Sequence, residues 1–222
     1  MIFHQNPTVG ISLLDDGNMG PSEDIRNPNR LNFFARLGIE PSRVRGVKQI
    51  HSRRVVTAVR KPVPADGLVS CRRDLVLSVT VADCVPVFLW DRYERGFGIV
   101  HSGWKGTGIV LDAVSLLEEK YGIPASDLHA YIGPSIGPCC YEVDSERARR
   151  FRDEWGEAAV VEGEGTSRLD LPGTNWRLLV DAGIGEIDTA GKCTCCSPEL
   201  GSYRRQGSTG FTRMIAFIGY LV

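Results

Sequence analysis

Three short segments of the 222-residue chain combine metal-binding residue types with glycines and prolines that shape tight turns. They are Val47–Ser52 (VKQIHS), Val81–Pro86 (VADCVP) and Val100–Thr107 (VHSGWKGT). These segments hold His51, Cys84 and His101, each near the end of an expected strand. Two imidazoles and one thiolate form a competent Zn²⁺ ligand set that leaves the fourth tetrahedral position to water or substrate. The spacing matches no short zinc-finger pattern, so the alternative is two hydrogen-bonded histidines and an apolar cysteine.

Cationic residues beside glycine-rich turns are candidates for binding an anion. Lys105 precedes a Gly-Thr-Gly turn that leads into an expected helix, and helix N–H groups beside a lysine can hold phosphate. The alternative there is a threonine N-cap with a solvated lysine. Arg204 and Arg205 lie close to Gly207 and suit a bidentate oxyanion clamp, although paired arginines also occur on solvated faces.

A second group of cysteines invites a structural zinc hypothesis. It consists of Cys139, Cys140, Cys193, Cys195 and Cys196. The spacing is not that of paired CxxC motifs and no histidine lies close by, so we interpret these residues as buried thiols. The chain has seven cysteines, an odd number, and its N-terminus lacks the features of a signal peptide. We therefore expect reduced thiols and a cytoplasmic protein.

Composition and charge exclude several classes of protein. The chain is 42% apolar and 24% charged, which is typical of a globular protein and not of a disordered or coiled-coil one. There are 26 basic and 27 acidic residues, so the basic excess of a nucleic-acid binder is missing. No uncharged apolar run is long enough to span a bilayer. We expect neither a nucleic-acid nor a membrane partner, and the oligomeric state stays open.

Hydrophobic patterning predicts both strands and helices. The expected strands are Arg53–Val59, Leu75–Val81, Val85–Trp90, Phe97–Val100, Leu128–Ile132 and Arg213–Val222, and the expected helices are Gly108–Lys120, Asp144–Trp155 and Thr174–Ala182. The strands from Leu75 to Val100 suggest a small β-meander, and Asp15–Asn29 is typical of a long surface loop. Without a strict βαβ rhythm, the order favours one layered α+β domain over residues 1–222, with mixed sheets flanked by helices.

Five motifs together resemble the laccase-domain family, also called multicopper polyphenol oxidoreductase or YfiH-type. They are QIHS, ADCVP, HSGWKGT, IGPSIGPCCYEV and SYRRQGSTG, and the resemblance runs from about Asn29 to Val222. It implies a layered α+β fold and a zinc ion held by two histidines and one cysteine. It also implies purine nucleoside phosphorylase activity on adenosine, inosine, guanosine and methylthioadenosine, together with adenosine deamination. The implied partners are a purine nucleoside and phosphate.

Residue by residue, the resemblance places the metal ligands on His51, Cys84 and His101. It points to Asp83, Lys105 and Arg204 as catalytic polar groups around them.

Two departures from the family pattern bear on substrate contacts and on substrate choice. The TxRxGGxS-like opening is replaced by Gly10–Leu14, which lacks the arginine, and the closing RDGxTGR pattern is altered over Arg205–Arg213.

The family's older name can be tested by counting histidines. A multicopper oxidase needs about ten histidines for its copper cluster, and this chain has four. A single copper at the His₂Cys set stays possible, but no axial methionine is evident. Met1 and Met19 fall in expected flexible segments and Met214 in the last strand. The expected cofactor is therefore Zn²⁺, with Cu²⁺ possible.

Three functional hypotheses follow. The leading one is a zinc-dependent purine nucleoside enzyme in which Lys105 and Arg204 orient phosphate and Asp83 moves protons. The second is a cysteine hydrolase with Cys84 as nucleophile and His101 or His51 as base. The third is a metal-binding protein without turnover.

Overall fold

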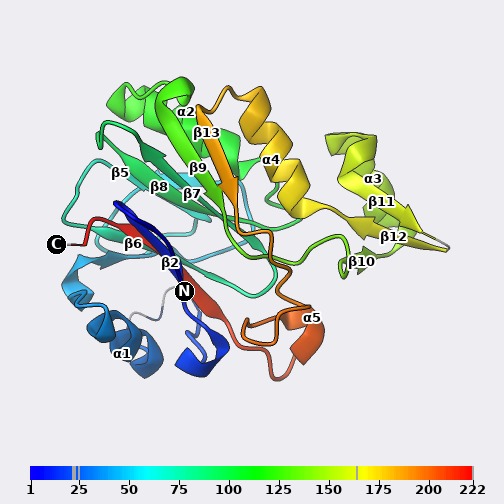
Figure 1. Ribbon diagram of the computed structural model, residues 1–222, viewed down its shortest axis with the longest axis horizontal. Coiled ribbons are helices and arrows are strands. Elements are labelled where there is room, and N and C mark those ends of the chain that lie inside the picture. The colour runs from blue at the N-terminus through cyan, green and yellow to red at the C-terminus, as the bar shows by residue number, and fades with distance from the viewer. Residues whose placement is uncertain (22–23, 25, 164, 222) are drawn as a thin grey trace.

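Two β-sheets stacked face to face form the centre of the protein, seen in a computed structural model that describes residues 1–21, 24, 26–163 and 165–221 (Figure 1). The first sheet contains β1 (Ile2–Gln5), β2 (Thr8–Ile11), β14 (Met214–Gly219), β6 (Val76–Val81) and β3 (Val44–Arg45), in that spatial order. The second contains β13 (Glu186–Thr189), β9 (Leu128–Ile132), β7 (Val85–Asp91), β8 (Phe97–Ser102), β5 (Gly67–Ser70) and β4 (Val55–Thr57). Each of these sheets contains both parallel and antiparallel pairs.

Alternating side chains of the central strands divide between two apolar cores. In β6, Leu77 and Val79 point into the space between the sheets, where they join Phe88 and Ile99 of the second sheet. Val76 points the other way, to the outer face of the first sheet. A strand whose two faces are both covered reads as a nearly continuous apolar run, which is what β6 shows.

Helices cover the outer faces of both sheets (Figure 1). Helix α1 (Pro28–Arg36) packs Phe33 and Phe34 against Phe217 of β14, each with ring centroids 5.8 Å apart. On the opposite side, α2 (Ile109–Tyr121) and α4 (Leu171–Asp181) bury their apolar faces against the second sheet. The predicted layered α+β fold with mixed sheets flanked by helices is therefore confirmed.

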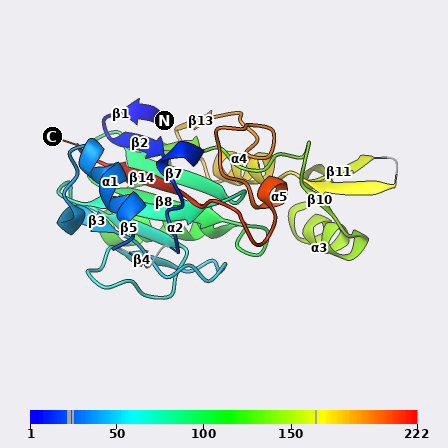
Figure 2. The ribbon, with the colours of Figure 1, turned by 90° about the horizontal axis from the view of Figure 1, so that it is seen from below.

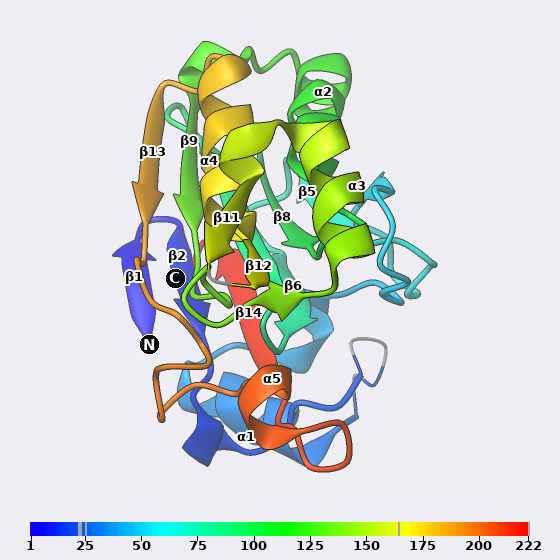
Figure 3. The same ribbon diagram turned by 90° about the vertical axis from the view of Figure 1, so that its right-hand side faces the viewer.

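A smaller unit projects from one end of this core (Figures 2 and 3). It pairs β12 (Thr166–Leu169) with β10 (Glu142–Val143) and β11 (Val160–Gly163), next to α3 (Ser145–Trp155). The short helix α5 (Tyr203–Gln206) lies at the same end. Single 3₁₀ turns occur at Leu14–Asp16, Pro41–Arg43, Ala125–Asp127 and Glu157–Ala159. None of the helices in the described part of the chain has the length and apolar character that a bilayer span requires.

The predicted β-meander is confirmed only for β7 and β8, because β6 belongs to the other sheet. β7 does pair with β8 as an antiparallel hairpin, but β6 pairs with β14 and β3 in the other sheet. The chain changes sheets at Asp83, whose φ of 89° is in the left-handed region. The sequence thus predicts the apolar strands correctly. The abrupt turn at Asp83 places β6 and β7 in different sheets, where they pair with different strands.

The predicted surface loop Asp15–Asn29 is only partly irregular. Helix α1 already begins at Pro28, where the Asn27 side chain accepts hydrogen bonds from the first turn. Met19, expected in a flexible segment, is fully buried in the core beneath α1. Positions 22, 23 and 25 of this loop, and Val222 of the last predicted strand, lie outside the described residues.

Candidate metal centre

The three predicted ligands converge at one end of the stacked sheets. The ligand atoms of His51, Cys84 and His101 all lie within 4.8 Å of one another. His51 comes from the loop between β3 and β4, Cys84 from the turn between β6 and β7, and His101 from the end of β8. His101 continues the alternation of Phe97 and Ile99, so its ring points between the sheets. Two imidazoles and a thiolate at this separation fit Zn²⁺.

The loop that carries His51 is held in an unusual conformation. His51 has a φ of 58°, which is costly for a residue other than glycine and persists only where the surroundings impose it. Part of this support comes from Gln49, whose amide donates to the Thr80 carbonyl at 2.9 Å and accepts from the Thr80 N–H at 2.8 Å. These bonds fasten the loop to the end of β6.

The sequence analysis missed Asp66, the carboxylate that organises this site. Asp66 is fully buried just before β5. Its oxygens accept hydrogen bonds from the N–H groups of Ile50 at 3.2 Å, His51 at 2.9 Å and Ser52 at 2.7 Å. They also contact the His101 Nδ1 at 3.0 Å. One side chain therefore holds both histidines, and its only signal in the sequence was a lone carboxylate beside an apolar strand.

The charge of Asp66 fixes the tautomer of His101. Burial opposes ionisation of Asp66, but hydrogen bonds from His101 and Ser52 outweigh it and lower the pKa of Asp66 to about 2. An ionised carboxylate accepts the proton on Nδ1 and leaves Nε2 of His101 to face the ligand cluster. Carboxylates orient metal-binding histidines in this way in many proteins.

The two histidines also favour the thiolate form of Cys84. Burial opposes its ionisation, but the neighbouring His101 and His51 lower the pKa of Cys84 to about 6. For His101 burial acts against the charged form, while Cys84 and Asp66 together raise its pKa to about 9. The metal-free site therefore holds a thiolate beside an imidazolium, and a cation would replace the imidazolium proton.

A cavity of about 540 Å³ opens beside the three ligands. Its walls come from segments far apart in the sequence, at the end of the molecule where α3 and α5 lie. Besides the ligands, the aromatic and cationic residues that line it are Trp104, Tyr141, Arg147, Tyr203, Arg204, Phe211 and Arg213. This combination suits a flat ring and an anion.

Two of the predicted catalytic residues, Asp83 and Arg204, line this cavity and contact each other. Asp83 accepts a hydrogen bond from the Thr194 hydroxyl at 2.6 Å and another from the Arg204 N–H at 2.7 Å. The Arg204 guanidinium donates to the Glu142 carbonyl and lies 5.5 Å from the Tyr141 ring centroid. One Asp83 oxygen thus holds α5, and the other holds the segment that carries Thr194, against the turn that contains Cys84.

Lys105, the third predicted catalytic residue, is exposed and does not line the cavity among the described residues. Its Nζ lies 5.5 Å from the centroid of the Trp104 ring. The threonine N-cap considered for the following helix is also absent, because α2 is capped at Gly108 and the Thr107 hydroxyl donates to the Gly103 carbonyl. Lys105 therefore lies outside the wall formed by Trp104.

Arg147 on α3 is a cation that the sequence analysis did not select. It lines the cavity and lies with its guanidinium carbon 4.8 Å from the Trp104 ring centroid. Next to it, burial and the nearby Cys84 raise the pKa of Tyr141 to about 12, against the opposing effect of Arg147. Tyr141 therefore keeps its phenolic proton at neutral pH. No spacing rule links position 147 to the ligand motifs, so only the fold brings it here.

The interpretation of the second group of cysteines as buried thiols is wrong. Cys139 and Cys196 are exposed, and Cys140 and Cys193 are partly exposed. The sulfurs of these four residues lie within 4.8 Å of one another. Distant chain segments meet at this point, which the irregular spacing concealed.

We predict that Gly103→Ala weakens the binding of added Zn²⁺ at this candidate site by about tenfold, because disturbed support of a ligand costs roughly 10- to 100-fold in affinity. A Cβ at position 103 would lie 3.0 Å from the Cys84 sulfur and 3.7 Å from the His51 ring. Gly210→Ala is the matched control, since its nearest neighbour would be 3.9 Å away. Competition with a zinc chelator measures both affinities, and equal values for the two variants would contradict the prediction.

Comparison with known proteins agrees with this architecture. The family described as multi-copper polyphenol oxidoreductase laccase matches residues 15–221. A purine nucleoside phosphorylase of Corynebacterium glutamicum is 34% identical over 93% of this chain and 86% of the relative. Another, from Deinococcus radiodurans, is 35% identical over 96% of this chain and 83% of the relative. The crystal structure of the Bacillus licheniformis hypothetical protein YfiH has a TM-score of 0.87 at 30% identity, covering 98% of this chain and 94% of that one. The chain therefore belongs to the multi-copper polyphenol oxidoreductase laccase family.

Proposed function

We propose that the protein is a zinc-dependent purine nucleoside phosphorylase that also deaminates adenosine. The observation that carries the proposal is the His51, Cys84 and His101 cluster at the wall of a cavity lined by arginines and aromatic rings. The names of the two relatives point to the same substrates. We place the activity in the cytoplasm, where free thiols such as those of this chain persist.

The metal would be held by the Cys84 sulfur, the Nε2 of His101 and a ring nitrogen of His51. Bound Zn²⁺ supplies a Lewis acid at the cavity wall, with one coordination position open. Copper is the less suitable occupant, because no methionine is among the described residues that line the cavity. The other two histidines of the chain bond elsewhere, His4 to the Pro7 carbonyl and His129 to Glu186.

The arginines would hold phosphate and direct it at the sugar. In phosphorolysis, a phosphate oxygen forms a bond to C1′ while the C1′–N9 bond breaks and its electron pair moves onto the purine. Arg147 and Arg204 both line the cavity next to Tyr141 and can share the charge of the phosphate. Asp83 is a positioning residue in this scheme, because it holds the backbone of Arg204. Lys105, outside the Trp104 wall, would attract phosphate to the entrance.

Tyr141 and two further rings would handle the purine. The protonated phenol of Tyr141 can donate its hydrogen to the departing base, whose nitrogens carry the new electron pair. Tyr203 and Phe211, with ring centroids 5.0 Å apart, offer apolar faces for stacking. Deamination would take place at the base and not at C1′: a water oxygen would form a bond to C6 of adenine while the C6–N bond breaks, and the amino group would leave as ammonia with the water proton, giving inosine.

The test is a product analysis with purified zinc-loaded protein. Adenosine and inosine are incubated with and without phosphate, and free base, ribose 1-phosphate and inosine are quantified. We expect free base and ribose 1-phosphate only with phosphate present, and inosine from adenosine in both conditions. If the fully zinc-loaded protein forms no product from either nucleoside, the proposed activity is wrong and the hypothesis of a metal-binding protein without turnover is favoured.

We predict that Arg147→Met raises the KM for phosphate by roughly 10- to 100-fold, because hydrogen bonds to charged groups contribute about 1.5–3 kcal/mol. Arg149→Met on the same helix is the control, since Arg149 is exposed and faces Asp153 at 3.9 Å. Phosphate titrations at saturating inosine measure the effect. An unchanged phosphate KM in the Arg147 variant would remove Arg147 from the anion site.

A metal-independent cysteine hydrolase is the second candidate, favoured by one observation. Cys84, His101 and Asp66 have the order of nucleophile, base and orienting carboxylate. Against it, a second imidazole from His51 contacts the same thiol, which a hydrolase does not need and a metal site does. Activity that survives complete removal of zinc but is lost on alkylation of Cys84 would favour the hydrolase.

A further inference from the structure

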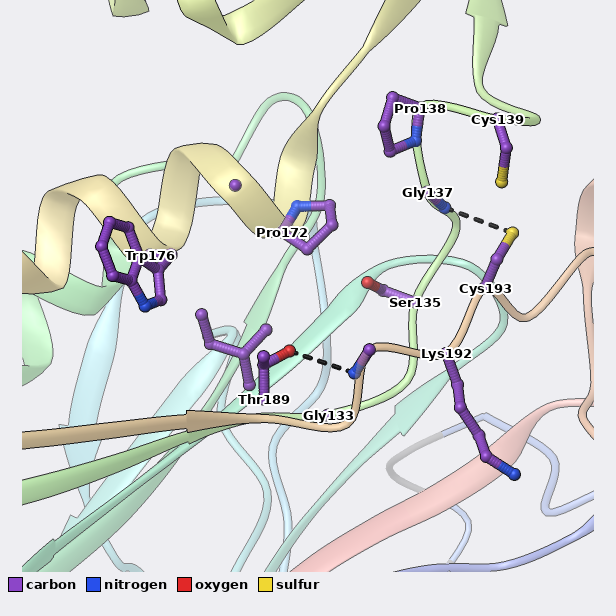
Figure 4. A pocket seen from close by; sticks show the side chains of 13 residues that line it. Gly133, Ser135, Gly137, Pro138, Cys139, Pro172, Trp176, Thr189, Lys192 and Cys193 are labelled. Atoms are coloured by element: carbon purple, nitrogen blue, oxygen red, sulfur yellow. Dashed lines mark hydrogen bonds between the residues drawn. The ribbon is translucent and has the colours of Figure 1, made fainter.

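Four cysteine sulfurs from two distant segments meet beside a second cavity, of about 350 Å³. Figure 4 shows this cavity with two of the four, Cys139 and Cys193, in its wall. Cys139 and Cys140 lie in the turn after β9, and Cys193 and Cys196 lie in the segment after β13. The Cys196 sulfur is 3.4 Å from that of Cys140 and 3.7 Å from that of Cys139. All four sulfurs lie within 4.8 Å of one another.

The two separations from Cys196, 3.4 and 3.7 Å, are close to those of thiolates around one tetrahedral ion. With Zn–S bonds of about 2.3 Å, the sulfurs of a tetrahedral Cys₄ site lie about 3.8 Å apart. Disulfides explain the arrangement less well, because a disulfide joins only two sulfurs, at about 2.05 Å, and does not account for the closeness of the other two. Cys196 is nearly equidistant from Cys139 and Cys140, and so does not select one partner.

The backbone holds the two segments together independently of the sulfurs. Ser135 and Cys193 form a parallel β-bridge, in which the Thr194 N–H donates to the Ser135 carbonyl at 3.0 Å. The Gly137 N–H donates to the Cys193 sulfur at 3.3 Å, drawn as a dashed line in Figure 4. N–H···S bonds of this kind support metal-bound thiolates.

We propose that Cys139, Cys140, Cys193 and Cys196 bind a second Zn²⁺ ion, with a structural role and no open coordination position. This ion would join the segment that leads to Tyr141 with the one that carries Thr194, whose hydroxyl bonds Asp83 beside Cys84. The Arg205 guanidinium already donates to the carbonyls of Thr194 and Ser197 on the same side. The second ion would therefore stiffen one wall of the active-site cavity. The inference does not depend on the proposed reaction.

Metal counting on the intact chain tests the proposal. Protein purified under reducing conditions is analysed for zinc per chain. We expect two ions in the wild type, one in Cys84→Ala, one in Cys140→Ser and none in the double variant. Cys195→Ser is the matched control, because Cys195 lies between two of the ligands and is not one of the four; it should retain two ions. Zinc content that is unchanged by Cys140→Ser would overturn the proposal.

A second measurement covers the case in which Cys140→Ser does not fold. Zinc in the folded Cys84→Ala protein is exchanged for Co²⁺, and the absorption spectrum is recorded. Four thiolate ligands predict strong thiolate-to-cobalt charge-transfer bands and the visible bands of tetrahedral cobalt. A spectrum without these bands would overturn the proposal. So would disulfides among these cysteines, which lower the mass of the protein by about two daltons per disulfide relative to the fully reduced chain.

Discussion

Replacement of Cys84 by alanine is expected to remove the zinc ion proposed for the His₂Cys site and to lower the proposed nucleoside phosphorolysis by about a thousandfold or more. Cys84 supplies the thiolate of the set, and the remaining two imidazoles leave half of a tetrahedral site unfilled. Lewis-acid stabilisation by a metal contributes several kcal/mol, and each 1.4 kcal/mol corresponds to about tenfold in rate. Elemental analysis and inosine phosphorolysis, measured on the same samples, check both parts of the expectation.

Cys71→Ala is the control for this experiment, because Cys71 is exposed and belongs to neither cysteine cluster. It should keep the zinc content and the turnover of the wild type. Loss of turnover in Cys84→Ala with the His₂Cys zinc ion retained would instead identify Cys84 as a nucleophile. Full turnover in Cys84→Ala would contradict the metal-dependent mechanism.

The sequence predicts the central strands and the metal ligands for related reasons. Apolar and β-branched residues on both faces of Val76–Val81 mark a strand that is buried on both sides. Metal ligands must lie at fixed distances from a shared point, and the ends of buried strands are rigid supports for them. Cys84 and His101 stand out because each lies at such a strand end, whereas His51 lies in the loop between β3 and β4 and stands out because histidine is rare in this chain.

Other parts of the fold and site depend on contacts that no local pattern contains. Helix α1 was not predicted, and its first two residues were assigned to the loop Asp15–Asn29. Its stability comes from packing on Phe217, far along the chain. Arg147 enters the cavity only because α3 is placed beside Trp104. Lys105 shows the reverse: it is adjacent to the motif in sequence, yet the turn directs it outward along the Trp104 ring.

Asp66 links the fold to the site more directly than any other residue. Its backbone carbonyl accepts a hydrogen bond from the His101 N–H at 2.7 Å, and its side chain holds the loop that carries His51. The carboxylate therefore fixes one ligand relative to the other before a metal binds. Such preorganisation lowers the cost of assembling the site around the ion.

We expect Asp66→Asn to weaken zinc binding by roughly 10- to 100-fold, as for other changes in the groups that orient metal ligands. In the wild type these donors bond to two carboxylate oxygens, whereas the asparagine amide has only one oxygen. Either His101 Nδ1 or the Ile50–Ser52 loop therefore loses its acceptor. Asp66→Ala removes both acceptors, and each buried N–H left unsatisfied costs about 1–3 kcal/mol of folding stability. Zinc competition and thermal unfolding measure the two effects.

Asp112→Asn is the control for Asp66→Asn, because the half-exposed Asp112 carboxylate pairs with Arg53 on the surface of α2. Exposed ion pairs contribute only about 0–1 kcal/mol, so this variant should match the wild type in zinc affinity and nearly in stability. If Asp66→Asn bound zinc as tightly as Asp112→Asn, His101 would be oriented by packing alone. A selective loss in Asp66→Asn would instead make the buried carboxylate, with its fixed negative charge, the group that sets the affinity of the centre.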